Sequence, residues 1–182
     1  MTLTMKISDL PMANRGTLNQ ICVSTSIHKQ ISKEKTMYRN AFGLDIQNLV
    51  SNGKFSEADS HLLRKLLVIN CGLKPQDQIF VATGPGTLFE AKLAFPDGEV
   101  KIGRGQNGAD YKLKEHLSGL AEKALSFGTI FVGTGDHELL PEVEQIRDAG
   151  GSVVLVGVQN SIHNPYYHLG IPVLELPPLE TL

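Results

Sequence analysis

The sequence predicts an α/β domain with a mainly parallel sheet of about five to six strands and helices on both faces. From residue 39 onward, short apolar runs alternate with amphipathic helical patterns, as in a chain of β-α units. Two runs, 129–133 and 152–158, are apolar throughout, which is typical of strands buried on both faces. The chain has 182 residues, 41% of them apolar, enough for one domain and a modest extension.

Residues 1–38 lack a long periodic pattern, so we expect an N-terminal extension there. It is interpreted as an arm or an added strand, with a short strand over 21–27. The same segment is the candidate contact for a homodimer or a protein partner.

The elements of the main domain, 39–182, follow in regular order. Strands are expected over 40–45, 77–83, 99–102, 129–133, 152–158 and 171–176. Helices are expected over 55–70, 87–95, 109–125 and 137–151. Ser56 can cap the first of these helices with Asp59 three residues later, and Gly72 follows its end. Pro141 falls in the first turn of the last helix, where proline is tolerated.

Two helices have an apolar face in the sequence. The first face is expected to consist of Leu62, Leu63, Leu66, Leu67 and Ile69. The second is expected to consist of Leu113, Leu117, Leu120, Ala121, Ala124 and Leu125.

Four acidic residues lie at or just beyond predicted strand ends: Asp45, Asp110, Asp136 and Glu138. Ligands of open parallel sheets bind at the carboxyl ends of the strands, so we expect these side chains at one edge. Gathered carboxylates repel one another unless a divalent cation neutralises them. Phosphodiester hydrolysis by two metal ions uses such a cluster. The pattern therefore predicts a Mg²⁺ or Mn²⁺ site and a metal-dependent nuclease.

Helix capping is the alternative interpretation of these acids. Asp110 and Asp136 open predicted helices, and Glu138 lies in a first turn, where acids are favoured without any ligand. Capping explains Asp45 least, because Asp is depleted in strands and this one ends an apolar run; a turn is its alternative. Convergence of the carboxyl groups would favour the metal site over capping.

Two polar residues near the acids are candidate assistants. Asn48 could orient a water molecule or bind phosphate, and a turn is its alternative role. Thr134 could bond a phosphate or a metal's water, and a bond to its own backbone is the alternative.

His137 could be a metal ligand or a general base, although helical spacing favours a position facing solvent. Tyr166 and Tyr167 could stack on unpaired bases or could simply pack.

The charge balance limits the kind of nucleic-acid contact. With 17 Lys and Arg against 19 Asp and Glu, the net charge of −2 argues against a protein that wraps duplex DNA. A local basic patch remains, because Lys101, Arg104, Lys112 and Lys114 flank Asp110. We interpret these four as candidate RNA-binding residues, with a solvated loop and helix face as the alternative.

Three motifs in order, "GLDIQNL", "GQNGADYKLKEHL" and "FVGTGDHELLPEVEQIRDAGGSVVLVG", resemble the NYN domain of the PIN-like nuclease superfamily. The resemblance covers about residues 40–160. It implies a Rossmann-like, PIN-like fold and Mg²⁺- or Mn²⁺-dependent endonucleolytic cleavage of RNA.

Carried over by position, the resemblance assigns metal ligands and assisting residues. The implied ligands are Asp45, Asp110, Asp136 and Glu138, with Asn48 and Thr134 assisting. The chain departs from the family pattern at two of these places, where Glu138 replaces an Asp and Thr134 replaces a Ser. A catalytically weak or inactive module that binds RNA or protein is the alternative function.

A rival pattern is the Gly-x-Gly-x-x-Gly of Gly103, Gly105 and Gly108, the dinucleotide fingerprint. The strand before it is short and charged, and the acid expected about 20 residues onward is missing from 126–128.

Two isolated cysteines, Cys22 and Cys71, fit a reducing cytoplasm. No apolar run reaches the roughly 20 residues that span a bilayer, so we expect a cytoplasmic protein without a membrane segment.

Overall fold

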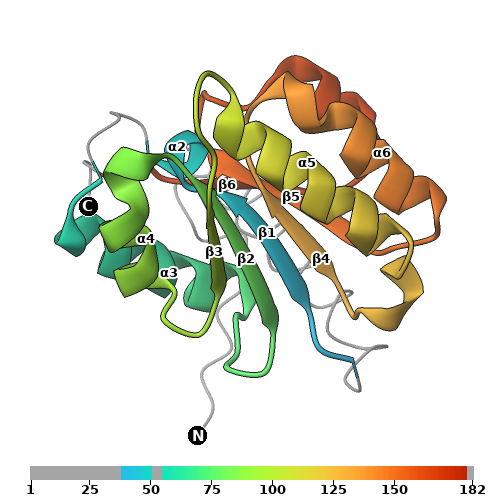
Figure 1. Cartoon of the computed structure of the whole chain (residues 1–182). Helices are drawn as coiled ribbons and strands as arrows, with labels where there is room; N and C mark the ends of the chain where they lie inside the picture. The colour runs from blue at the N-terminus through green and yellow to red at the C-terminus, as the bar shows by residue number, and fades with distance from the viewer. Residues whose placement is uncertain (1–37, 51–54, 180–182) are drawn as a thin grey trace, which may run out of the picture. The chain divides into compact units, whose positions relative to one another are not determined.

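A six-stranded sheet in which every pairing is parallel forms the centre of the protein (Figure 1). The structure is a computed structural model that describes residues 38–50 and 55–179. The strands are β1 (Ala41–Asp45), β2 (Gln78–Thr83), β3 (Glu99–Ile102), β4 (Ile130–Gly133), β5 (Val153–Val158) and β6 (Val173–Leu176). Each lies within one of the predicted runs. The prediction of a parallel, Rossmann-like α/β sheet is therefore confirmed.

The helices follow the predicted order as well. They are α2 (Ile46–Leu49), α3 (Glu57–Cys71), α4 (Leu88–Ala94), α5 (Gly108–Ala121) and α6 (Leu140–Asp148). Short 3₁₀ turns are η3 (Pro85–Thr87), η4 (Ala124–Ser126), η5 (His137–Leu139) and η6 (Asn164–His168). Neither α2 nor η6 is expected from the sequence, because each is too short to show a periodic pattern.

The ends of α3 form as the sequence predicts. The Ser56 side chain accepts from the Asp59 backbone N–H, and the Asp59 carboxylate accepts from Ser56 in return. Gly72 follows the helix in the left-handed conformation, with φ of 66°. Both signals are local, so the rest of the fold does not alter them.

Two residues expected on apolar faces are exposed instead. Ile69 is 63% exposed because it lies two residues, about 200° of helical turn, beyond buried Leu67. Leu125 is 69% exposed because α5 ends at Ala121, after which the helical period no longer applies. The expectations for Ile69 and Leu125 were wrong.

Helices cover both faces of the sheet, since alternate strand residues point to opposite sides. On one face, α3 and α4 pack over residues such as Phe42, which stacks on Phe131 with ring centroids 4.7 Å apart. On the other face, α5 and α6 lie side by side (Figure 1). A Cβ on Gly43 of β1 would lie 2.9 Å from Leu117 Cδ2, so this glycine lets α5 rest close to β1.

The strand order β3-β2-β1-β4-β5-β6 reverses direction between β1 and β4. The chain runs from β1 outward to β3, and α5 then carries it back to place β4 on the other side of β1. The segments that follow β1 and β4 therefore leave the sheet in different directions. In open α/β sheets, such a switch point is where ligands bind.

No helix in the described ranges, 38–50 and 55–179, is long and apolar enough to cross a membrane. The extension expected over residues 1–38 lies outside those ranges except for Tyr38. The strand over 21–27 and the partner contact assigned to that extension therefore stay predictions.

Candidate functional site

Two of the four predicted acids, Asp45 and Asp110, meet beside the switch point. Asp45 is the last residue of β1 and is only 2% exposed. Asp110 lies in the first turn of α5, and its carboxyl group is within hydrogen-bonding reach of Asp45. Asp110 Oδ1 is buried, and no N–H or O–H group of the described residues donates to it. The two carboxyl groups can therefore bond to each other only while one of them keeps a proton.

The environment of this pair makes its full ionisation unfavourable. Burial, followed by the hydrogen bond and the charge of Asp110, raises the pKa of Asp45 to about 7. Backbone N–H groups of Gln47 and Asn48 oppose this increase. A buried carboxyl oxygen without a donor among the described residues, Asp110 Oδ1, suits a hard divalent cation, which prefers oxygen ligands. The Asp45–Asp110 pair would offer two carboxyl groups to such an ion, and Mg²⁺ and Mn²⁺ are ions that take oxygen ligands.

Asp45 is also a helix cap, contrary to expectation. Its Oδ1 accepts from the Gln47 backbone N–H at 2.9 Å, which caps α2. Capping was expected to explain Asp45 least, and this was wrong because α2 begins directly after β1 with no loop between them.

Asp110, in contrast to Asp45, does not cap a helix. The cap position of α5 belongs to Asn107, and Asp110 lies three residues further on, against Asp45. The capping interpretation of Asp110 was therefore wrong as well. The Asp110 carboxyl group, which the sequence places at the start of a helix, faces the Asp45 carboxyl group in the folded protein.

Asn48 and Thr134 connect the two sides of the switch point. Asn48 Nδ2 donates to Asp45 Oδ2 at 2.8 Å and lies 3.4 Å from Thr134 Oγ1. Thr134 is fully buried, and its Oγ1 also accepts from the Asp136 backbone N–H at 3.0 Å. Both assisting residues therefore belong to the same network as the carboxyl pair.

Asp136 is connected to Asp45 through three hydrogen bonds, by way of Asn48 and Thr134. Its Oδ1 accepts from the Glu138 backbone N–H at 3.0 Å, so it caps η5 as the capping interpretation expects. Its Oδ1 is also 3.1 Å from Nδ1 of His137, whose side chain is 62% exposed. Within the described part of the chain, no three His, Cys, Asp or Glu side chains are grouped closely enough to hold a metal ion.

The buried side chain of Tyr166 holds the segment after β4 that carries Asp136. Its hydroxyl donates to the Asp136 carbonyl oxygen at 2.6 Å, and its side chain is fully buried. Stacking of Tyr166 on an RNA base is therefore excluded, and packing is its role. Tyr167 remains 46% exposed, and its hydroxyl bonds to Glu175.

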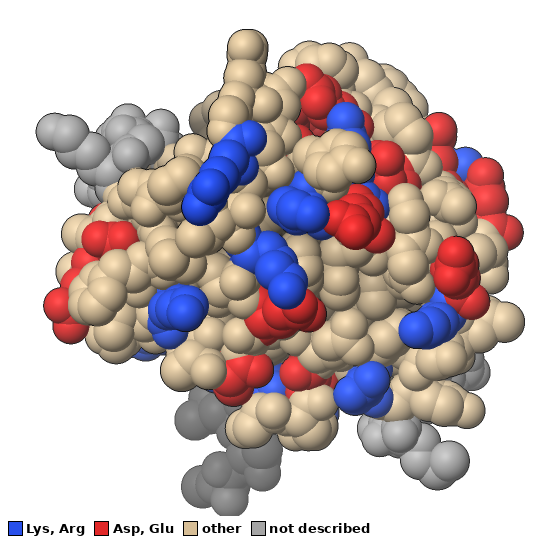
Figure 2. Space-filling view, in the orientation of Figure 1, with Lys and Arg blue, Asp and Glu red and all other residues tan. Residues whose placement is uncertain are grey.

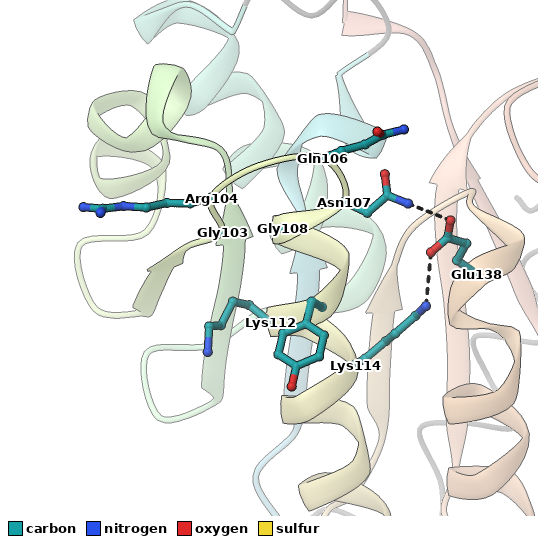
Figure 3. A pocket seen from close by; sticks show the side chains of 9 residues that line it. Gly103, Arg104, Gln106, Asn107, Gly108, Lys112, Lys114 and Glu138 are labelled. Atoms are coloured by element: carbon teal, nitrogen blue, oxygen red, sulfur yellow. Dashed lines mark hydrogen bonds and ion pairs between the residues drawn. The ribbon is translucent and has the colours of Figure 1, made fainter.

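Glu138 is turned toward α5. Its Oε1 accepts from Asn107 Nδ2 at 2.9 Å and its Oε2 accepts from Lys114 Nζ at 3.1 Å (Figure 3). Both oxygens of this predicted ligand thus already have a donor. Sequence reasoning missed Asn107, although Asn in a glycine-rich loop is a recognisable signal for its left-handed φ of 55°.

The Gly-x-Gly-x-x-Gly loop has a structural explanation of its own. A Cβ on Gly103 would lie 1.9 Å from the carbonyl carbon of Gly108, so the two backbones cross in contact. Gly105 has a φ of 79°, which favours glycine. The loop follows β3 at the sheet edge, whereas the dinucleotide fingerprint follows the first strand of its fold. The glycine spacing therefore needs no bound dinucleotide.

Two hollows lie beside the glycine loop and α5. A pocket of about 430 Å³ is lined by that loop with Tyr111, Lys112, Lys114 and Glu138 (Figure 3). We call it the loop pocket. A groove of about 790 Å³ lies between α5 and strands β2 and β3, and Lys112 lines both hollows.

The four predicted basic residues line these hollows, three of them next to a carboxylate. Lys101 pairs with Glu99 at 2.9 Å, and Lys112 pairs with Glu115 at 3.0 Å. Figure 2 shows Lys and Arg intermixed with Asp and Glu over this face. Arg104 takes part in none of the ion pairs within the described ranges, and its side chain extends away from Glu138 (Figure 3).

Comparison with known proteins adds little to this geometry. No family model matches the chain, and no curated protein matches it. Among solved structures, the glycosyltransferase GlyE of Streptococcus pneumoniae TIGR4 is similar, with 11% identity and a TM-score of 0.42. That match covers 88% of this chain and 35% of GlyE, so the chain spans about a third of that protein. At this level of similarity no function is transferred.

Proposed function

We propose that the protein is a metal-dependent endoribonuclease that hydrolyses RNA phosphodiester bonds, as its resemblance to PIN-like NYN domains implies. The observation that carries the proposal is the meeting of the carboxyl groups of buried Asp45 and half-buried Asp110. The pair lies at the carboxyl end of a central strand beside the switch point. One of its buried oxygens has no donor among the described residues, a deficit that a cation would meet.

The proposed roles follow from the hydrogen-bond network. Asp45 and Asp110 would hold Mg²⁺ or Mn²⁺, and Asp136 would join them only after the segment that follows β4 moves closer, since the three carboxyl groups are not grouped in this structure. When bound, such a cation neutralises charge on the phosphate and makes water a better nucleophile. Asn48 fixes the Asp45 carboxylate, and Thr134 ties the Asp136 backbone to the same point. Glu138 would become a ligand only after Lys114 and Asn107 release it.

The RNA strand would be held beside this centre. Lys101, Arg104, Lys112 and Lys114 line the two hollows next to α5, where their charges can contact phosphates. A cytoplasmic site of action is part of the proposal, because the two cysteines of the sequence suit a reducing compartment.

A cleavage assay on single-stranded RNA tests the proposal. The purified full chain should cut with Mn²⁺ or Mg²⁺ and should stop when EDTA is added. Asp110→Asn and Asp136→Asn should each abolish cutting, whereas Glu57→Gln, an exposed first-turn acid of α3, should cut normally. Cutting that survives both EDTA and Asp110→Asn would refute the mechanism.

The second candidate is a module of the same fold that binds RNA or protein without cutting. The engagement of both Glu138 oxygens by Asn107 and Lys114 favours it, because this removes one of the four predicted ligands. This candidate predicts RNA binding that is insensitive to EDTA and to Asp110→Asn, in a protein that shows no cleavage.

A further inference from the structure

Tyr111 is a large aromatic side chain left in solvent next to the candidate centre. It follows Asp110 on α5, and 67% of it is exposed. Neighbouring residues on a helix point about 100° apart, so Asp110 turns inward to Asp45 while Tyr111 faces outward. The ring lines the loop pocket, which also contains Glu138 from the candidate site.

One cationic group lies beside this ring, and a second lines the same pocket. Lys112 Nζ lies 5.8 Å from the centroid of the Tyr111 ring. Arg104 lines the same pocket and is in no ion pair within the described ranges. An aromatic face with one cation beside it and another in the same pocket matches a planar base joined to a charged phosphate backbone. Leu125, which is equally exposed at 69%, lines neither hollow.

We propose that Tyr111 is a stacking platform for one unpaired base of a single-stranded RNA, with Arg104 and Lys112 contacting the flanking phosphates. This inference rests on the proposed function, because it names the substrate of that site. Bases in a duplex are already stacked on each other and cannot cover a protein ring, so the platform selects single strands. It would hold the strand next to Asp110, the adjacent residue of α5.

The absence of tryptophan from the sequence permits a direct test. Tyr111→Trp places one tryptophan in the loop pocket, and Leu125→Trp places one in η4, beyond the end of α5, as a control with matched exposure. In EDTA, a single-stranded oligoribonucleotide should quench the fluorescence of Tyr111→Trp. The same strand in a duplex should not, and Leu125→Trp should respond to neither.

Affinity measurements complete the test. Tyr111→Ala should weaken binding of the single strand roughly tenfold in fluorescence anisotropy, because one stacked base is lost. Tyr111→Phe keeps the ring and should bind like the unaltered protein. The platform is refuted if the unaltered protein binds the strand while Tyr111→Trp is not quenched, or if Tyr111→Ala binds equally well.

The outcomes separate this inference from the proposed function. Quenching and the affinity loss in a protein that never cuts would support the platform and end the nuclease proposal. Metal-dependent cutting that Tyr111→Ala leaves unchanged would support the nuclease and end the platform. An unaltered protein that binds no single-stranded RNA would end both.

Discussion

Replacing Asp110 by Asn should stabilise the metal-free protein at pH 8 but not at pH 5. The folded pKa of Asp45 is about 7, against an ordinary value of 3.8. Between these values the folded protein binds more protons than the unfolded chain, so stability falls as pH rises from about 4 to about 7. At pH 8 the full cost of ionising Asp45 is present, about 4 kcal/mol at roughly 1.36 kcal/mol per pKa unit.

Only part of this cost disappears in the variant. Burial is the largest cause of the raised pKa and remains, whereas the hydrogen bond and the charge of Asp110 are removed. We assign about 1–2 kcal/mol to those two causes. Loss of an acid from the first turn of α5 costs about 0.3–1 kcal/mol. The net gain of about 1 kcal/mol corresponds to a Tm increase of roughly 3 °C at pH 8.

Thermal unfolding followed by circular dichroism in EDTA measures this change at both pH values. Glu57→Gln removes a first-turn acid of α3 whose side chain is 70% exposed, so at pH 8 it reports the helix contribution; at pH 5 it also removes the contact at 4.0 Å with His61. A lower Tm for Asp110→Asn than for the unaltered protein at pH 8, or the same difference at pH 5 and pH 8, would contradict the paired-carboxyl interpretation.

Three other predictions concern the same region. Excess Mn²⁺ at pH 8, at about 100 times its Kd, should stabilise the unaltered protein by about 2.7 kcal/mol in urea unfolding and leave Asp110→Asn unchanged; equal stabilisation of both would exclude Asp110 as a ligand. Thr134→Val should cost about 1–3 kcal/mol in urea unfolding, because a buried hydroxyl that accepts from Asp136 and Asn48 is lost; a neutral result would contradict this network. Gly103→Ala should destabilise the protein by at least about 2 kcal/mol, because its Cβ would overlap the Gly108 backbone. Gly86→Ala, where a Cβ meets nothing within 4 Å, is the matched control, and equal effects would refute the crossing of the two backbones.

Much of the fold could be predicted because its signals act over a few residues. The Ser56 and Asp59 capping pair and the apolar runs of the strands depend on neighbours in the chain. The errors occurred where the end of an element matters, as at Leu125, since α5 stops at Ala121 for reasons outside the local pattern. The short helix α2 was missed for a related reason, because four residues show no period.

The residues of the candidate site could likewise be predicted from the sequence, but their pairing could not. Residue type and position at strand ends identified the four acids, along with Asn48 and Thr134 as assistants. All six residues lie along one chain of hydrogen bonds that begins at the Asp45–Asp110 pair. Which of the acids face one another could not be deduced, because it depends on how closely α5 lies on β1. Gly43 sets that approach by leaving room for Leu117.

The sequence by itself determined the order of strands and helices and the edge of the sheet to which the acids belong, because alternation and capping are properties of short segments. Only the tertiary structure decided that Asp45 caps α2 and meets Asp110, while Glu138 is held by Asn107 and Lys114. The physical reason is that side-chain partners come from elements far apart in the chain. Their pairing depends on the strand order and on the distance at which each helix packs on the sheet.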